Sequence, residues 1–289
     1  MATTARNFSF TGFVRLTRLG NLVILVMAQY FTVLFLVAKG ANKLTHLIDS
    51  KLFLLSLSTV LIAAAGYIIN DYYDVKIDYV NKPERVIVGK VLKRRVVMAA
   101  HSVINLLGIG IGFLVSPRLA LINFGSALLL WLYSNQLKRL PFVGNFAVAI
   151  LAGLSIYIIE LHYKTGNLII LAYAMFAMGY TLIREIIKDM EDVKGDETFD
   201  CRTLPVVYGL RKTKIVLYVF SSLFALKLFL LFKWIDVQFF TWLLLGNAVA
   251  LIMLSVLLFR SDTKSEFHKL STLTKVVMLL GIISMIWIN

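Results

Sequence analysis

Charged residues and cysteines are scarce in this sequence of 289 residues. Only 16% of the residues are Asp, Glu, Lys or Arg and 59% are hydrophobic, whereas soluble proteins have about 25% charged residues. The single cysteine, Cys201, excludes an internal disulfide framework and a metal or cluster site built from several cysteines. Together with a mean hydropathy of +0.82, this composition indicates a polytopic membrane protein.

Acidic residues are also few, and the chain carries 30 Lys and Arg against 16 Asp and Glu, a formal net charge of +14. Nucleic-acid binding is a poor explanation of this excess in so apolar a chain, and we expect no nucleic-acid partner. In membrane proteins a basic excess is typical of cytoplasmic loops that lie against anionic lipid, and it also suits an anionic substrate.

Apolar stretches long enough to cross a membrane occur nine times. They cover residues 20–39, 52–70, 96–115, 118–134, 142–160, 167–185, 214–232, 238–259 and 272–288. We therefore predict an all-α membrane bundle of about nine transmembrane helices around a central cavity, forming one domain over residues 1–289. Only Ser116-Pro117-Arg118 separates the third stretch from the fourth, which predicts a tight helical hairpin. No cleavable signal peptide is evident, because the polar start leads directly into a span-length apolar run.

Lysine and arginine are distributed unevenly between alternate loops. The N-terminal segment and the loops after the second, fourth, sixth and eighth stretches hold 23 of the 30 basic residues. The positive-inside rule therefore predicts a multi-pass protein of the cell (inner) membrane, with its N-terminus and these loops in the cytoplasm and its C-terminus outside.

Eleven of the 16 acidic residues are concentrated in two short segments at the predicted cytoplasmic side, residues 71–84 and 185–200. Because successive helical residues are rotated by about 100°, the spacing places each cluster on one helical face, whereas Glu191 points away. The first cluster is Asn70, Asp71, Asp74 and Asp78, and the second is Asp189, Asp192 and Asp196.

Carboxylates crowded on one helical face repel each other unless cations neutralise them, and hard oxygen ligands favour Mg²⁺ or Ca²⁺. A diphosphate bridged by Mg²⁺ between the two faces would complete this neutralisation. Solvated helix ends are the alternative explanation, and they would be favoured for a single D-x-x-D. Two clusters of the same design, each at the cytoplasmic end of an even-numbered span, favour a site instead.

The patterns N-D-x-x-D-x-x-x-D from Asn70 and D-x-x-D-x-x-x-D from Asp189 resemble the pair of aspartate-rich motifs of the UbiA-type intramembrane prenyltransferases. The resemblance covers nearly the whole chain, including the intervening segment Tyr133 to Lys138, which reads YSNQLK. It implies a nine-helix membrane enzyme that binds a prenyl diphosphate through Mg²⁺ and transfers the prenyl group to an acceptor. The two clusters would be the catalytic residues and the metal ligands.

Within that superfamily the sequence is most similar to the digeranylgeranylglyceryl phosphate synthases. The segments 70–85, reading NDYYDVKIDYVNKPER, and 184–209 carry this likeness. It implies a lipophilic acceptor, geranylgeranylglyceryl phosphate, and an ether product. The sequence departs after Arg85, where a typical R-P-I-P-S-G run is replaced by RVIVGK and is apparently one residue shorter. Prenylation of an aromatic or quinone-precursor acceptor stays an alternative, and so does a cation transporter, because intramembrane carboxylates also mark ion paths.

Basic and polar residues near the clusters are predicted to bind the substrate phosphates. Positive-inside topology alone explains much of the basic excess, and an interfacial aromatic belt is an alternative role for Tyr133. The predicted substrate-binding residues are Arg18, Asn21, Arg85, Lys90, Tyr133, Ser134, Lys138 and Arg184. A phosphorylated acceptor would also need a second basic subsite. The segment 85–95, with Lys93 and Arg94, and the region of Arg202 are the best supplied with cations.

Overall fold

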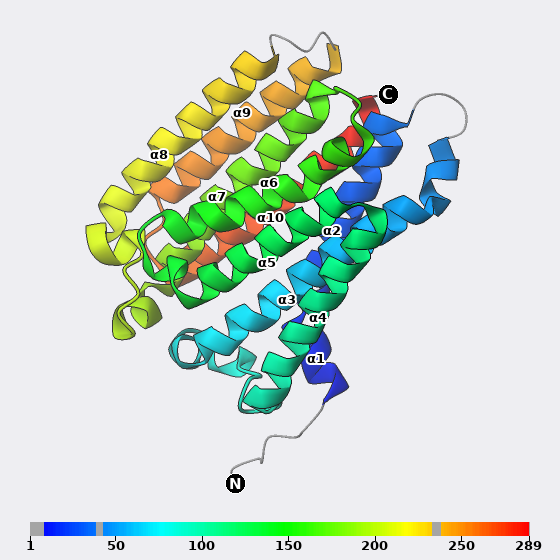
Figure 1. Cartoon of the computed structure of the whole chain (residues 1–289). Coiled ribbons are helices and arrows are strands. Elements are labelled where there is room, and N and C mark those ends of the chain that lie inside the picture. The colour runs from blue at the N-terminus through cyan, green and yellow to red at the C-terminus, as the bar shows by residue number, and fades with distance from the viewer. Residues whose placement is uncertain (1–8, 39–42, 233–237, 289) are drawn as a thin grey trace.

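Helices make up nearly all of the computed structural model, which describes residues 9–38, 43–232 and 238–288 (Figure 1). In chain order they are α1 (Phe10–Leu16), α2 (Leu19–Thr32), η1 (Val33–Val37), η2 (Lys43–Ile48), α3 (Ser50–Asn81), η3 (Pro83–Arg85), α4 (Arg94–Val115), α5 (Pro117–Asn135), η4 (Leu137–Arg139), α6 (Val143–Tyr163), α7 (Leu168–Thr198), α8 (Leu204–Phe232), α9 (Gln238–Phe259), α10 (Lys264–Ser284) and η5 (Met285–Ile288). The described ranges contain no β-strand.

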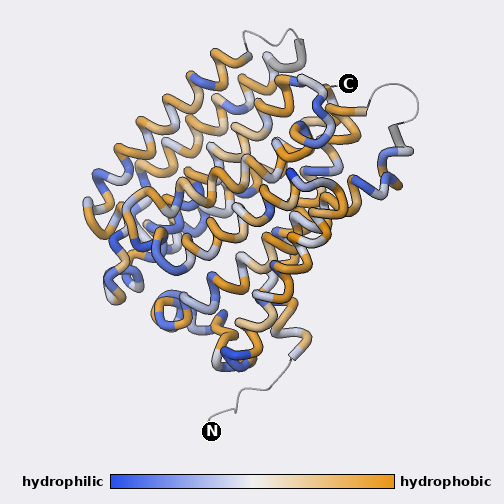
Figure 2. The backbone as a smooth tube through the Cα atoms, in the orientation of Figure 1, coloured by the Kyte–Doolittle hydropathy of each residue, from blue (hydrophilic) through white to orange (hydrophobic). Residues whose placement is uncertain are grey.

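The prediction of an all-α membrane bundle is confirmed. In the described part of the chain, eight helices are long and apolar enough to span a membrane, and α5, with 19 residues, lies among them as a ninth long helix. Figure 2 shows hydrophobic residues along the lengths of the helices and hydrophilic residues gathered toward their ends. Large apolar side chains on the outer helices α8 and α9 are exposed, as expected for surfaces that face lipid.

Two helices extend well beyond the C-terminal ends of the apolar stretches that predict them. Helix α3 has 32 residues and α7 has 31, and each continues past the end of its apolar stretch at residue 70 or 185. These extensions carry the two carboxylate clusters. The acidic segments are therefore the last turns of two long helices, and the helical spacing assumed from the sequence applies to both.

The expected hairpin between the third and fourth long helices is present. Ser116 ends α4 and also caps α5, because its hydroxyl accepts a hydrogen bond of 3.1 Å from the backbone N–H of Leu119. Pro117 occupies the first position of α5, where a missing N–H costs no helical hydrogen bond.

Six long helices surround a central cavity of about 1220 Å³, and the short α1 adds Val14 and Arg15 to its lining. The six are α2, α3, α5, α6, α7 and α10, and the described residues of α4, α8 and α9 contribute nothing to the lining. Helix α4 packs outside this ring against α3 and α5, and α8 and α9 pack outside it against α7 and α10. Helices α3 and α7 pack against each other, which brings the two acidic segments to one end of the cavity.

Candidate active site

The two carboxylate clusters face the same end of the cavity. All seven predicted residues line it: Asn70, Asp71, Asp74 and Asp78 from α3, and Asp189, Asp192 and Asp196 from α7. Glu191, which the helical spacing directs elsewhere, does not line the cavity. It is 7% exposed, and its Oε1 lies 3.1 Å from Nδ1 of His268 in α10.

A side chain that the motif analysis did not single out joins α3 to α7. The Oδ1 of Asn81 accepts a hydrogen bond of 3.0 Å from the backbone N–H of Gly195, and its Nδ2 donates to the carbonyl oxygen of Asp192 at 3.0 Å. Lys264 of α10 donates to the carbonyl oxygen of Asn81 at 2.7 Å. Asn81 therefore fixes the end of α3 next to two of the acidic residues of α7. Asn81 follows Asp78 by three residues and so continues the helical spacing of the first cluster. This spacing is the sequence feature from which its position could have been predicted.

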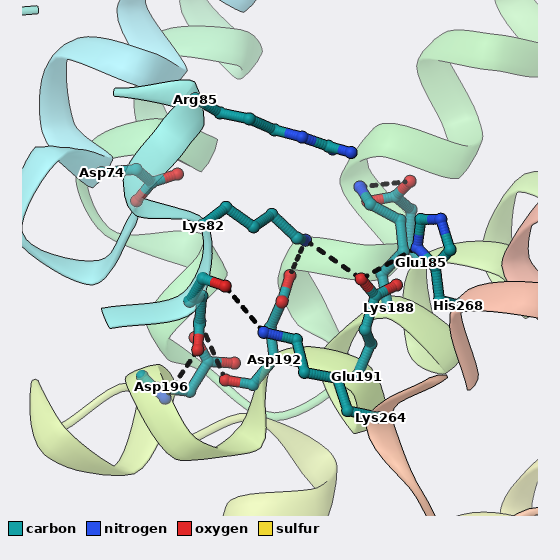
Figure 3. Close-up of polar contacts among 12 residues, drawn as sticks. Asp74, Lys82, Arg85, Glu185, Lys188, Glu191, Asp192, Asp196, Lys264 and His268 are labelled. Atoms are coloured by element: carbon teal, nitrogen blue, oxygen red, sulfur yellow. Dashed lines mark hydrogen bonds and ion pairs between the residues drawn. The ribbon is translucent and has the colours of Figure 1, made fainter. Parts of the chain in front are cut away.

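Three of the aspartates are paired with cations from other segments. Arg18 Nη2 lies 2.6 Å from Asp71 Oδ1, and Lys138 forms an ion pair with Asp74. Lys82 Nζ lies 2.7 Å from Asp192 Oδ2 and 3.5 Å from Glu191 Oε1 (Figure 3). The site thus joins the start of α2, the turn after α5 and the end of α3 to the acidic faces.

Neutral side chains hold other carboxylate oxygens. Asn145 of α6 donates from Nδ2 to Asp189 Oδ2 at 2.7 Å, and Thr203 donates to Asp196 Oδ2 at 3.3 Å. Asn70 donates from Nδ2 to Asp74 Oδ2 at 2.7 Å. These bonds orient the carboxylates toward the cavity and leave further oxygen lone pairs available. Asn145 and Thr203 lie outside the two motifs, and no feature of their local sequence distinguishes them.

The donor set fits a hard divalent cation such as Mg²⁺, although it is not assembled as a ready-made metal site. In the described ranges, no three Asp, Glu, His or Cys side chains converge closely enough to hold a metal ion. The six aspartates nevertheless outnumber the three cations paired with them, and Oδ1 of Asp192 is buried without a hydrogen-bond partner. An excess of buried carboxylate oxygens at the end of a cavity suits Mg²⁺, which takes oxygen ligands.

Away from the carboxylates the cavity is mostly apolar. Side chains of α2, α6 and α10, including Leu25, Leu151 and Ile282, line this part together with Tyr173 and Phe176 of α7. The cavity volume of about 1220 Å³ is larger than the 300–1,000 Å³ or so typical of small-molecule sites. A polar end joined to a long apolar chamber suits a ligand with an anionic head and an extended hydrocarbon chain.

Seven of the eight predicted substrate-binding residues line the cavity: Arg18, Asn21, Arg85, Lys90, Tyr133, Lys138 and Arg184. Ser134 does not, and the expectation for it is corrected. Because it follows Tyr133, it lies about 100° away around α5. It is 1% exposed, and its hydroxyl donates to the carbonyl oxygen of Leu130 at 2.9 Å.

Lys138 lies in the short η4 turn between α5 and α6, beside the aspartates. Burial of its ammonium lowers its pKa to about 8. Removing this group from water weakens its hydration, so that nearby carboxylate or phosphate oxygens become its main source of stabilisation.

The loop after η3 folds as a compact turn despite the loss of the expected prolines. Gly89 has a φ of +82°, and its N–H donates to the carbonyl oxygen of Leu92 at 2.8 Å. Val86, Val88 and Leu92 are buried, so that apolar packing anchors the turn, while Arg85 and Lys90 reach the cavity.

The residues expected to form a second basic subsite lie elsewhere. Lys93, Arg94 and Arg202 are exposed and do not line the cavity. The guanidinium of Arg94 packs over the ring of Tyr72, with its Cζ 4.4 Å from the ring centroid. The basic residues that do line the cavity beyond the predicted set include Lys82, Lys188 and Lys275.

Comparison with known proteins agrees with this geometry. Residues 25–279 match the UbiA prenyltransferase family. The chain belongs to this family. The digeranylgeranylglyceryl phosphate synthase of Methanosphaera stadtmanae is 32% identical over 242 residues, covering 83% of this chain and 88% of the relative. The protein of the same name from Sulfolobus acidocaldarius is 40% identical over 172 residues, 57% of this chain and 60% of that protein.

Solved structures share the fold. A structure of digeranylgeranylglyceryl phosphate synthase superimposes with a TM-score of 0.68 at 23% identity, covering 96% of this chain and 97% of the other. A UbiA homolog from Archaeoglobus fulgidus, bound to DMAPP and Mg²⁺, gives 0.71 at 16% identity, covering 94% and 99%.

UbiA membership decides between the two classes of function that the sequence left open. The protein is an enzyme, a prenyltransferase, rather than a cation transporter. It is an integral multi-pass membrane protein, as its spans indicate.

Proposed function

We propose that this prenyltransferase uses Mg²⁺ to transfer a prenyl group from a prenyl diphosphate to a prenylglyceryl phosphate, with formation of an ether. The observation that carries the proposal is the opposition of two acidic helical faces, from α3 and α7, at the polar end of a cavity with a long apolar chamber. The names of the relatives, which cover most of the chain, support the acceptor.

The donor diphosphate would lie between the acidic faces. Asn70, Asp71, Asp74 and Asp78 would hold one Mg²⁺, and Asp189, Asp192 and Asp196 a second. Bound there, Mg²⁺ would neutralise the diphosphate and make it a better leaving group. A UbiA homolog from Archaeoglobus fulgidus was solved with DMAPP and Mg²⁺ bound, which supports a prenyl diphosphate and Mg²⁺ as ligands of this fold.

The cations that pair with the aspartates would take phosphate oxygens as new partners. Arg18, Lys82 and Lys138 each contact a carboxylate that the proposal assigns to a metal. Once a carboxylate ligates a metal, its former partner is available to donate charge-assisted hydrogen bonds to the diphosphate. Arg85 and Lys90, from the turn that reaches the cavity, would bind the outer phosphate oxygens, and Tyr133 would donate its hydroxyl.

The apolar chamber would hold the prenyl chain and protect the reacting carbon. As the allylic C–O bond breaks, positive charge develops on the carbon, and the acceptor hydroxyl oxygen attacks it and releases its proton. Apolar walls would exclude water and so protect this centre from hydrolysis, and the aromatic rings of Tyr133 and Phe176, which line the cavity, would stabilise positive charge.

We also propose that the polar end of the cavity faces the cytoplasm, because the loops beside it hold most of the basic residues. Water-soluble diphosphate would then leave on the cytoplasmic side of the cell membrane. The chain would act as one domain, since the cavity is lined from residue 14 to residue 285.

Product analysis tests the proposal. The purified protein, with Mg²⁺ and a mixture of prenyl diphosphates, is given geranylgeranylglyceryl phosphate and an aromatic acid as competing acceptors, and the products are identified by mass spectrometry. We expect a mass increase of one prenyl group on the glyceryl phosphate. Prenylation of the aromatic acid alone would contradict the acceptor and leave the prenyl transfer standing.

A further inference from the structure

A second basic group lines the cavity, separate from the cations paired with the aspartates. It consists of Arg184 and Lys188 of α7 and Lys275 of α10. Glu185 is its one acidic member, and accepts from Arg184 Nη1 at 3.0 Å. It also accepts from Lys188 Nζ at 2.8 Å (Figure 3). With three cations and one carboxylate, this group carries a formal charge of +2. We refer to these four residues as the α7–α10 group.

Lys275 is the most informative member because it lacks an acidic partner. It lies within an apolar segment of α10, and in the described part of the chain no carboxylate forms an ion pair with it. Its Nζ donates to Oδ1 of Asn21 in α2 at 2.8 Å. A cation inside a membrane protein is costly and marks a functional site, with an anion as its expected partner.

Arg184 also has unused hydrogen-bonding capacity. Its Nη1 binds Glu185, but its Nε is buried without a hydrogen-bond partner. A buried donor without an acceptor costs free energy, and a ligand oxygen would satisfy it. Arg184, with its unsatisfied Nε, and Lys275 both line the cavity, and together they are suited to an anion with several oxygens.

We propose that the α7–α10 group binds the phosphomonoester of the acceptor. This inference rests on the proposed function, and it replaces the exposed residues Lys93, Arg94 and Arg202 as the second basic subsite. A phosphomonoester carries about −1.5 to −2 charge at neutral pH, which matches the formal charge of +2 of the group. A neutral quinone precursor would leave Lys275 without a counterion and the Nε of Arg184 without an acceptor.

The location also suits an acceptor that must meet the donor. Arg184 lies on the same helix as Asp189, five residues away, which is about 7.5 Å along the axis. The start of α2 connects the two regions. Arg18 pairs with Asp71 of the first acidic face, and Asn21, about one turn further along α2, accepts a hydrogen bond from Lys275. An acceptor phosphate held by the α7–α10 group therefore leaves its glycerol hydroxyl close to the donor end of the cavity.

Steady-state kinetics on the purified full chain in lipid nanodiscs test the subsite. Wild type, Lys275→Met, Lys275→Arg and the control Lys269→Met are compared with geranylgeranyl diphosphate as donor. Lys269 is a matched control because it is an exposed lysine of α10 that does not line the cavity. The acceptors are geranylgeranylglyceryl phosphate and the same alcohol without phosphate.

We expect Lys275→Met to raise the KM for the phosphorylated acceptor about 10- to 100-fold, the range for loss of a charge-assisted hydrogen bond. The donor KM and the KM for the unphosphorylated alcohol should stay within about twofold of wild type. Lys275→Arg should recover most of the affinity, and Lys269→Met should resemble wild type.

Other outcomes would overturn the subsite. An equal rise in the donor KM would assign these cations to the diphosphate, and an equal loss with both acceptors would show a structural role. If Lys275→Met binds a phospholipid without a free hydroxyl more weakly than wild type does, while its KM for the acceptor is unchanged, the α7–α10 group binds membrane lipid rather than the acceptor. If Lys275→Met does not fold, Arg184→Gln is measured in the same way, with equilibrium binding of the phosphorylated acceptor as a second readout.

Failure of the proposed function gives a different result. If wild type prenylates only an aromatic acid, the acceptor class itself is wrong, and the subsite is rejected with it. If wild type prenylates the glyceryl phosphate while Lys275→Met and Arg184→Gln keep its KM, the function stands and only the subsite is overturned.

Discussion

Asn81 and Gly195 are in direct contact where the end of α3 meets α7. The hydrogen bond between Asn81 Oδ1 and the N–H of Gly195 is 3.0 Å long. A β-carbon on Gly195 would lie 2.3 Å from Nδ2 of Asn81, so only glycine permits this approach. The contact sets the separation of the two acidic faces, because Asn81 also binds the backbone of Asp192.

Replacing Gly195 with alanine should therefore move the two faces apart. We expect Gly195→Ala to lower the thermal unfolding temperature, since overpacking costs about 1–3 kcal/mol, and to reduce kcat at least tenfold. Gly246→Ala in α9 is the matched control, because a β-carbon there meets nothing within 4 Å. Thermal melts and turnover of the two purified variants check this, and equal behaviour would contradict the role of the contact.

Loss of one carboxylate from either face should abolish most of the activity. Asp74→Ala and Asp192→Ala each remove a carboxylate that lines the cavity and that we propose as a ligand of Mg²⁺. We expect turnover to fall by about 10³-fold or more if charge neutralisation supplies several kcal/mol at the transition state. Membrane insertion and the gel-filtration profile should be unchanged. Near-normal turnover of either variant at saturating Mg²⁺ would contradict the mechanism.

Two adjacent acids of α7 should behave differently. Glu191 is directed about 100° away from Asp192 and does not line the cavity. Its carboxylate contacts Lys82 and His268. Glutamine retains the shape and the hydrogen-bonding oxygen of Glu191, so Glu191→Gln should keep at least tenfold more activity than Asp192→Asn. Parallel initial-rate measurements decide this. If both variants lose activity to the same extent, Glu191 has a catalytic duty that its position does not explain.

Local patterns were sufficient to predict the main features of the fold and the acidic faces. Apolar stretches locate most of the long helices, and the spacing of the aspartates identifies the face that lines the cavity, because both depend on neighbours in the same helix. The same geometry explains why the prediction for Ser134 was wrong. Ser134 follows Tyr133, so its side chain points about 100° away from the cavity, and its hydroxyl donates to the carbonyl oxygen of Leu130.

Contacts between distant segments were not predictable in this way. Asn145 meets Asp189 across 44 positions, and Lys82 meets Asp192 across 110. The number of cations in a loop does not tell which of them face inward, so Arg202 was favoured over Lys275. The usable signal for Lys275 was its place as a lone charge in an otherwise apolar stretch, which is costly without a partner.

The most direct test of the central claim is equilibrium binding of a non-hydrolysable donor. Geranylgeranyl thiodiphosphate is titrated into the purified protein by calorimetry, with and without Mg²⁺, for wild type, Asp74→Asn and Asp192→Asn. If the two acidic faces hold the diphosphate through Mg²⁺, the analogue binds to wild type only when the metal is present. Each of the two single variants should then fail to bind the analogue even with Mg²⁺. Equal affinity in the presence of a chelator, or full binding when either face is altered, would contradict the claim.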